Sequence, residues 1–225
     1  MTTVSANDDR YHNRDMLAPQ PGQFLSSGTG NQAEAARSVL LAGVGGQGIL
    51  LASNILARAA LLARYDVKTN EVHGMAQRGG SVVAEIRFGK TVYSPLIAPG
   101  GADVLASLEE MEALRYARYL SPNGMAMVST LRIIPTTVSS GLAKYPQNLP
   151  DKLRKAFRNL KRLDVAAAAE KVGNSKAGNL ALLGAVSTAL DFDQDLWRQA
   201  IGLCVKAKFV DMNLRAFRLG RELAA

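Results

Sequence analysis

Cysteine and histidine are scarce in this sequence. Its 225 residues include one cysteine, Cys204, and two histidines, His12 and His73. A disulfide within the chain is therefore impossible, and a reducing, cytoplasmic location is expected. Iron–sulfur clusters and structural zinc sites take several Cys or His ligands each. We therefore expect this chain to bind no metal of its own.

Long apolar segments are also missing. No stretch reaches the roughly 20 residues that a membrane-spanning helix requires, and the N-terminal region lacks the apolar core of a signal peptide. A chain of 225 residues is nevertheless long enough to bury a large core as one domain. The expectation is a soluble, globular protein.

The charge balance is basic and uneven. The formal net charge is +8, and residues 151–225 carry fourteen lysines and arginines against eight acidic residues. The densest part is "KLRKAFRNLKR", residues 152–162, whose apolar spacing predicts one amphipathic helix with a basic face. Such a face can be simply solvated, or it can contact an acidic partner or a ligand phosphate. Nucleic-acid binding is disfavoured because no motif for it is present.

The N-terminal region differs from the rest. Residues 1–37 are polar, include "APQPGQ" and "SSGTGNQ", and show no helical or strand periodicity. We interpret 1–37 as a disordered or partner-bound tail, and 38–225 as a single domain.

Alternating apolar runs and helical patterns predict an α/β fold for that domain. Strands are expected at 39–42, 67–69, 81–88, 102–108 and 125–130, and helices at 47–63, 109–120 and 152–162, with a largely helical remainder. Gly89-Lys90 resembles a hairpin turn that leads from "SVVAEIRF" into "TVYSPLI". The predicted architecture is a Rossmann-like three-layer domain with a mixed sheet, an antiparallel hairpin insertion and a helical C-terminus.

The first glycine motif, "GVGGQG", fits the pattern G-x-G-x-x-G between a strand and a helix. Glycines permit a sharp turn, and the N–H groups at the helix start attract a phosphate. The candidate ligand-binding residues are Gly43, Gly45, Gly46, Gln47 and Gly48. Glu71, twenty-three residues after Gly48, is the acid that a dinucleotide site would need. The alternatives are another anionic ligand, a contact with a partner, or glycines that only allow tight packing.

The second motif, "NEVHGMAQRGGSV", spans residues 70–82 and concentrates polar side chains in a short loop. His73, Gln77 and Arg78 are candidate contributors to a composite active site, and the Arg78 guanidinium suits a carboxylate or phosphate. The structural alternatives are an imidazole bonded to the backbone, and an ion pair of Arg78 with Glu71 or Glu85.

Together these motifs resemble a known family. The segments "LLAGVGGQGILLAS", "EVHGMAQRGGSV", "SPLI", "ADVLASLEEMEALR" and "KFVDMNLRAFRLGRE" are similar to the gamma-type domain family of 2-oxoacid:acceptor oxidoreductases, which includes the beta subunit of indolepyruvate ferredoxin oxidoreductase. The resemblance extends from about residue 38 to about residue 222. The two glycine motifs in this order are far more specific than a single glycine fingerprint.

The resemblance implies an accessory subunit of a hetero-oligomer that converts indolepyruvate, or a related aryl 2-oxoacid such as phenylglyoxylate, to an acyl-CoA. Electrons would pass to ferredoxin or another acceptor. Thiamine diphosphate, Mg²⁺ and [4Fe-4S] clusters are then expected on the large partner subunit, with coenzyme A as co-substrate and no tightly bound cofactor or activity in the isolated chain. The glycine turn and the Arg78 loop would face the shared cleft. Two alternatives stay open: a stand-alone NAD(P)-binding Rossmann protein and a purely structural partner.

Overall fold

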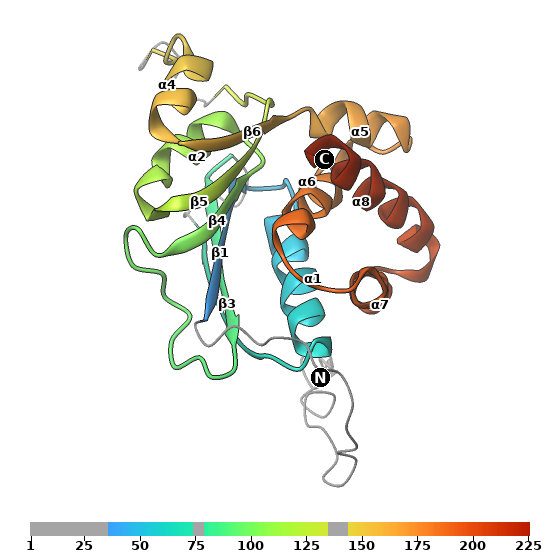
Figure 1. Ribbon diagram of the computed structural model, residues 1–225. Helices are drawn as coiled ribbons and strands as arrows, with labels where there is room; N and C mark the ends of the chain where they lie inside the picture. Colours follow the sequence, from blue (N-terminus) through green and yellow to red (C-terminus); the bar gives the residue numbers. More distant parts are fainter. Residues whose placement is uncertain (1–35, 74–78, 135–143) are drawn as a thin grey trace, which may run out of the picture. The chain divides into compact units, whose positions relative to one another are not determined.

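The structure is organised around one six-stranded mixed sheet (Figure 1). This computed structural model describes residues 36–73, 79–134 and 144–225. The strands are β1 (Arg37–Val44), β2 (Asp66–His73), β3 (Ser81–Gly89), β4 (Ala102–Ser107), β5 (Leu120–Ser129) and β6 (Asn159–Leu163). Their order across the sheet is β2-β3-β1-β4-β5-β6.

Two kinds of pairing meet at β1. On one side β1, β4, β5 and β6 run parallel to one another. On the other side β3 is antiparallel to both β1 and β2. The parallel strands all end at the same edge of the sheet, which is where ligands bind in open α/β sheets.

Helices cover both faces of the sheet. They are α1 (Ile49–Leu62), α2 (Glu110–Arg115), α4 (Leu149–Ala156), α5 (Val165–Lys171), α6 (Gly178–Val186), α7 (Gln194–Cys204) and α8 (Val210–Ala224). Figure 1 shows α1 and the C-terminal helices on one face, and α2 and α4 on the other. The predicted three-layer fold with a mixed sheet and a helical C-terminal part is confirmed. Among the described helices, none combines the length and apolar character needed to cross a membrane.

The central strand shows why two cores form. Successive side chains of a strand point to opposite faces. Leu41 therefore packs with α1 and the C-terminal helices, whereas Leu40 packs with α2 and α4, and both are fully buried. A continuous apolar run is typical of a strand that is covered on both sides.

The hairpin expected at Gly89-Lys90 is wrong. Residues 91–97 form no strand, because both edges of β3 are already paired, with β2 and with β1. The antiparallel hairpin is instead β2–β3. The segment after β3 is held by side chains of that strand: Glu85 accepts the Ile97 N–H at 3.1 Å, and the Arg87 guanidinium donates to the Ser94 carbonyl at 3.0 Å.

The single helix expected over residues 152–162 is also wrong. Helix α4 ends at Ala156, and Phe157 is extended, with φ −125° and ψ 118°. The second half of the segment forms β6, which pairs in parallel with β5. Leu153 and Phe157 are buried as the apolar spacing indicates. Pairing with β5 therefore overrides the helical pattern of the following residues.

Helices α6 and α8 touch at the level of their backbones. A Cβ atom on Gly184 would lie well under 3.0 Å from the Phe217 carbonyl oxygen, and one on Gly220 would meet the Ala181 carbonyl equally closely. Both glycines are therefore needed for this approach.

We expect Gly184→Ala to lower the free energy of unfolding by about 3 kcal/mol or more, since the methyl group meets rigid backbone. The matched control is Gly202→Ala in α7, where a Cβ meets nothing within 4 Å. This control should be neutral or stabilising by up to about 1 kcal/mol. Urea denaturation of both variants measures the difference, and equal stabilities would contradict the close packing.

Candidate functional site

The first glycine motif forms the turn between β1 and α1, at the edge where the parallel strands end. Gly46 and Gly48 have φ angles of +98° and +80°, in the left-handed region that favours glycine. Gly48 is the N-cap of α1 and has no side chain to cap it. The N–H groups in the first turn of α1 therefore have no acceptor within the helix.

Gln47 has a structural task in this turn. Its side-chain oxygen accepts the Val44 N–H at 2.6 Å, and its amide nitrogen donates to the Leu108 carbonyl at 3.1 Å. Gln47 thus joins the ends of β1 and β4 through both polar atoms of its side chain. Gly43 makes room for it, because a Cβ there would lie 2.8 Å from Gln47 Oε1.

The two glycine motifs meet in space. The Gly45 N–H donates to the Gly80 carbonyl at 2.8 Å, and Val44 is paired with Ser81. The backbone of His73 ends β2, opposite Val82. Residues 74–78, which include the predicted site residues Gln77 and Arg78, lie outside the described residues. The Gly80 end of their loop therefore lies beside the glycine turn, and the His73 end lies one strand further out.

The base of this loop is anchored from α2. The Ser81 hydroxyl donates to the Glu112 carboxylate, and the Arg115 guanidinium lies 3.1 Å from the other Glu112 oxygen. Glu112 is buried. A buried carboxylate with charged and hydroxyl partners holds its neighbours in place, so the start of β3 is rigidly positioned.

Glu71 and Glu85, the acids that the sequence suggests as partners, are held within β2 and β3. Both oxygens of Glu85 are engaged, with the Asn70 amide at 2.8 Å and with the Ile97 N–H. Glu71 is paired with Ala84, which is paired in turn with Leu41. Glu71 thus lies two strands away from β1, level with a residue that is three positions before the end of β1. A dinucleotide site needs its acid at the end of the neighbouring parallel strand, so this topology does not support the NAD(P) alternative.

A hollow of about 480 Å³ opens beside the turn. The turn contributes Gly46, Gln47 and Gly48, and the C-terminal half of the chain contributes side chains that include Lys176, Asn179 and Lys206. A smaller hollow of about 180 Å³ adjoins the turn, and Lys176 lines this one too. The turn is therefore flanked by space that a ligand can occupy.

Asn179 and Lys176 were missed by sequence reasoning. The Asn179 amide donates to the Gly48 carbonyl at 3.1 Å across 131 residues of sequence, and Asn174 Oδ1 accepts the Lys176 N–H at 3.0 Å. Their segment, "GNSKAGNL", could have been noticed as small polar residues directly before an apolar helix. The contact of Asn179 with the Gly48 carbonyl could not have been identified from the sequence.

The electrostatics of the larger hollow favour an anion. Lys176 and Lys206 line it, and no carboxylate does so among the described residues. The start of α1, which has no acidic residue in its first turn, adds the positive end of the helix dipole. Cys204 also lines the hollow. Burial raises the pKa of its thiol, so Cys204 stays protonated at neutral pH and is a poor nucleophile.

Acidic side chains near the same edge are committed to the fold. Glu110 is fully buried between Arg132, at 2.6 Å, and Arg162, at 2.5 Å. Glu109 accepts a hydrogen bond from the Tyr145 hydroxyl at 3.2 Å. Burial, together with the Glu109 charge, raises the pKa of Tyr145 to about 12. Within the described residues, no group of three His, Cys, Asp or Glu side chains is arranged to hold a metal ion.

Comparison with known proteins places this geometry in context. The family described as pyruvate ferredoxin/flavodoxin oxidoreductase matches residues 38–223. The indolepyruvate oxidoreductase subunit IorB of Archaeoglobus fulgidus is 42% identical over 191 residues, covering 83% of this chain and 94% of that protein.

Solved structures share the fold. The pyruvate oxidoreductase subunit PORC of Thermotoga maritima aligns with a TM-score of 0.64 at 22% identity, over 83% of this chain and 96% of that one. The 2-oxoglutarate:ferredoxin oxidoreductase of Magnetococcus marinus, with 2-oxoglutarate, coenzyme A and succinyl-CoA bound, aligns with a TM-score of 0.65 at 17% identity, over 84% of this chain and 31% of that one.

We expect Gly48→Ala to be more destabilising than Gly46→Ala. Each alanine would occupy left-handed backbone, at about 1–2 kcal/mol, but only at position 48 would the new Cβ collide with the Asn179 amide. The double variant Gly48→Ala/Asn179→Ala should then lose less than the sum of the two single losses. Thermal denaturation of wild type, Gly48→Ala, Asn179→Ala and the double variant measures this coupling, and Gly46→Ala is measured beside them for the first comparison. Strict additivity would show that Asn179 does not hold the turn.

Proposed function

Because this chain belongs to the pyruvate ferredoxin/flavodoxin oxidoreductase family, we propose that it is the small subunit of an enzyme that oxidatively decarboxylates indolepyruvate or a related aryl 2-oxoacid. The product would be an acyl-CoA, and ferredoxin or another acceptor would take the electrons. The aryl substrate is supported by the name of the relatives that match along nearly their whole length.

The redox chemistry belongs to the large partner subunit in this proposal. One cysteine cannot supply the thiolates of a [4Fe-4S] cluster, and the two histidines are His12 and His73. The donor set of this chain therefore does not fit such a cluster. Thiamine diphosphate, which stabilises a carbanion at the substrate carbonyl carbon, is likewise assigned to the partner together with Mg²⁺.

The work of this chain is to bind and orient coenzyme A at the shared cleft. The observation that carries this assignment is the basic hollow beside the glycine turn, with Lys176 and Lys206 on its walls. Free N–H groups at the start of α1 and two ammonium groups suit phosphate oxygens. The Magnetococcus marinus enzyme, in which the shared fold makes up 31% of the matched chain, has coenzyme A bound, and this supports the ligand class.

The second glycine motif would complete the cleft. The Gly45–Gly80 hydrogen bond brings the end of its loop to the turn, and covalent connectivity keeps Arg78 within two residues of Gly80. We assign to Arg78 a charge-assisted contact with the substrate carboxylate or a coenzyme A phosphate. His73 and Gln77 are the other proposed contributors from this segment.

Reconstitution tests the proposed function. The chain alone should contain no iron or thiamine and reduce no acceptor. Co-expressed with its large subunit, it should catalyse reduction of a viologen dye that depends on both coenzyme A and an aryl 2-oxoacid. Iron in stoichiometric amount in the lone chain would refute the proposal. Tight dinucleotide binding by the lone chain, combined with an inactive complex, would also refute the proposal.

Two substitutions test the site within that complex. Arg78→Ala should lower kcat/KM by roughly ten- to a thousandfold, and Arg78→Lys should restore little, because an ammonium group lacks the planar fork. Lys176→Gln should raise the KM for coenzyme A roughly tenfold with little change in kcat. The control is Lys90→Gln, an exposed lysine outside the hollow. Unchanged kinetics, or losses in proportion to weaker assembly, would mean that Arg78 and Lys176 have only structural roles.

A further inference from the structure

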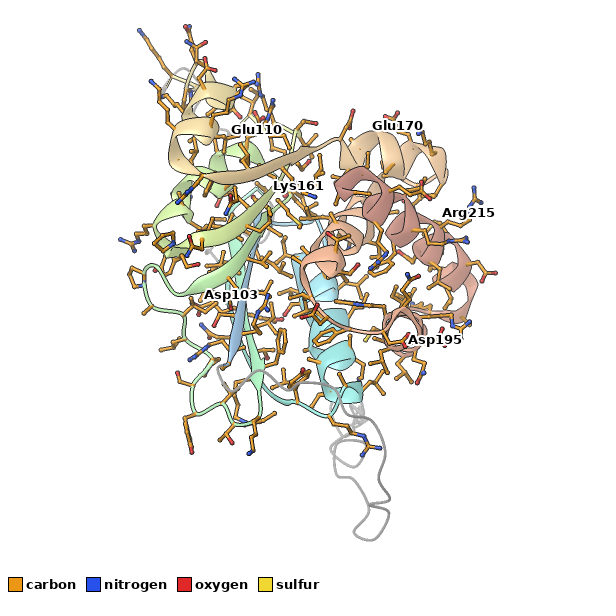
Figure 2. The ribbon with its side chains drawn as sticks, viewed as in Figure 1. Asp103, Glu110, Lys161, Glu170, Asp195 and Arg215 are labelled. Atoms are coloured by element: carbon orange, nitrogen blue, oxygen red, sulfur yellow. The ribbon has the colours of Figure 1, made fainter. Side chains whose placement is uncertain are left out.

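A row of arginines lies on the outer side of α8, in the helical layer that also contains α1. Arg215 and Arg218 lie one turn apart on this helix, and both are exposed. Figure 2 shows Arg215 directed away from the sheet into solvent. With Arg198 of α7 and Lys171 of α5 on either side, we call this surface the arginine ridge.

Hollows lie on both sides of the ridge. One of about 430 Å³ separates α7 from α8, and its lining includes Leu214 and Phe217. The other, of about 260 Å³, adjoins Lys171 and includes Leu219. Arg215 and Arg218 line both hollows. The surface is thus a cationic crest between two partly apolar depressions, which is broader than a pocket for one small molecule.

The ridge has an excess of positive charge that the fold does not use. Five cationic side chains and three carboxylates line the two hollows. Arg198 is paired with Asp195 at 3.2 Å, and Arg221 donates to the Ser187 hydroxyl at 2.7 Å. Arg215 and Arg218 are each four residues from a carboxylate on the same helix, yet in the described part of the chain neither forms an ion pair.

Helix α8 packs closely against α6, and its exposed arginines lie outside the hollow beside the glycine turn. Helix α8 is held against α6 through Gly184 and Gly220. Its Met212 and Asn213 line the hollow beside the glycine turn, whereas Arg215 and Arg218 do not. The helix backbone that carries the ridge is therefore held in place, and its charges are not part of the proposed coenzyme A site.

We propose that the arginine ridge docks onto an acidic surface of the large partner subunit. This inference rests on the proposed function, which supplies the partner. Guanidinium groups pair with carboxylates through two parallel hydrogen bonds, and arginine is enriched at protein interfaces. The apolar floors of the hollows supply area to bury around those pairs. Opposite charge on the partner would also steer association with a chain of net charge +8.

The test compares binding of the purified large subunit to three forms of this chain: wild type, Arg215→Glu/Arg218→Glu, and the control Lys90→Glu/Arg118→Glu. The control changes the net charge equally at exposed positions outside the ridge. Titrations at low and high salt give the affinity and its salt dependence. Circular dichroism verifies folding, and Arg215→Gln/Arg218→Gln serves as a milder second variant.

We expect the ridge reversal to weaken binding at least tenfold at low salt and to reduce the salt dependence, with the control near wild type. Equal losses in both reversals would overturn the proposal, because net charge rather than the ridge would then be responsible. Unchanged binding of the large subunit would also overturn it. So would unchanged binding combined with slower turnover with a protein electron acceptor, because the ridge would then act on the acceptor and not on the large subunit. If the wild-type chain forms no complex with the large subunit, the proposed function itself fails.

Discussion

The antiparallel pairing of β3 with β1 is the constraint on which the rest of the structure depends. It occupies the edge of β1 where a dinucleotide-binding fold has its second parallel strand, and it displaces β2 and Glu71 outward by one strand. The same register pairs Val44 with Ser81 and joins Gly45 to Gly80. One pairing thus removes the features of an NAD(P) site and brings both glycine motifs to a common edge.

The second half of the chain completes that edge from a distance. Close contact of α6 with α8 requires glycine at 184 and 220. The start of α6 supplies Asn179, which holds the Gly48 carbonyl, and the turn before α6 supplies Lys176. A turn whose N-cap has no side chain is therefore supported by an amide from another helix. This explains how a glycine-rich turn can be both open to a ligand and well defined.

Charged side chains divide into those that support the fold and those that face a hollow or the surface. Glu109, Glu110 and Glu112 are buried and bonded to arginine, tyrosine, serine and backbone groups, so they consolidate the fold near the site without lining the larger hollow. Lysines face that hollow, and arginines occupy the outer side of α8. The proposed accessory subunit, which recognises anions and contacts a partner, is consistent with this arrangement, since the described residues offer neither a metal ligand set nor an activated thiol.

The sequence by itself determined the fold class, the helix after the glycine turn, the buried strands and the family, because these depend on local periodicity and on motifs that are contiguous. It could not determine strand pairing. The expected hairpin at Gly89 failed because β3 had two other partners, and the second half of the 152–162 helix was lost to pairing with β5. For the site, the glycine turn lies between β1 and α1 as the motif predicts, but the structural use of Gln47 and the proposed roles of Asn179 and Lys176 depend on residues that are distant in sequence. Only tertiary structure decides such contacts, since hydrogen bonds and packing between distant segments leave no periodic signal in either one.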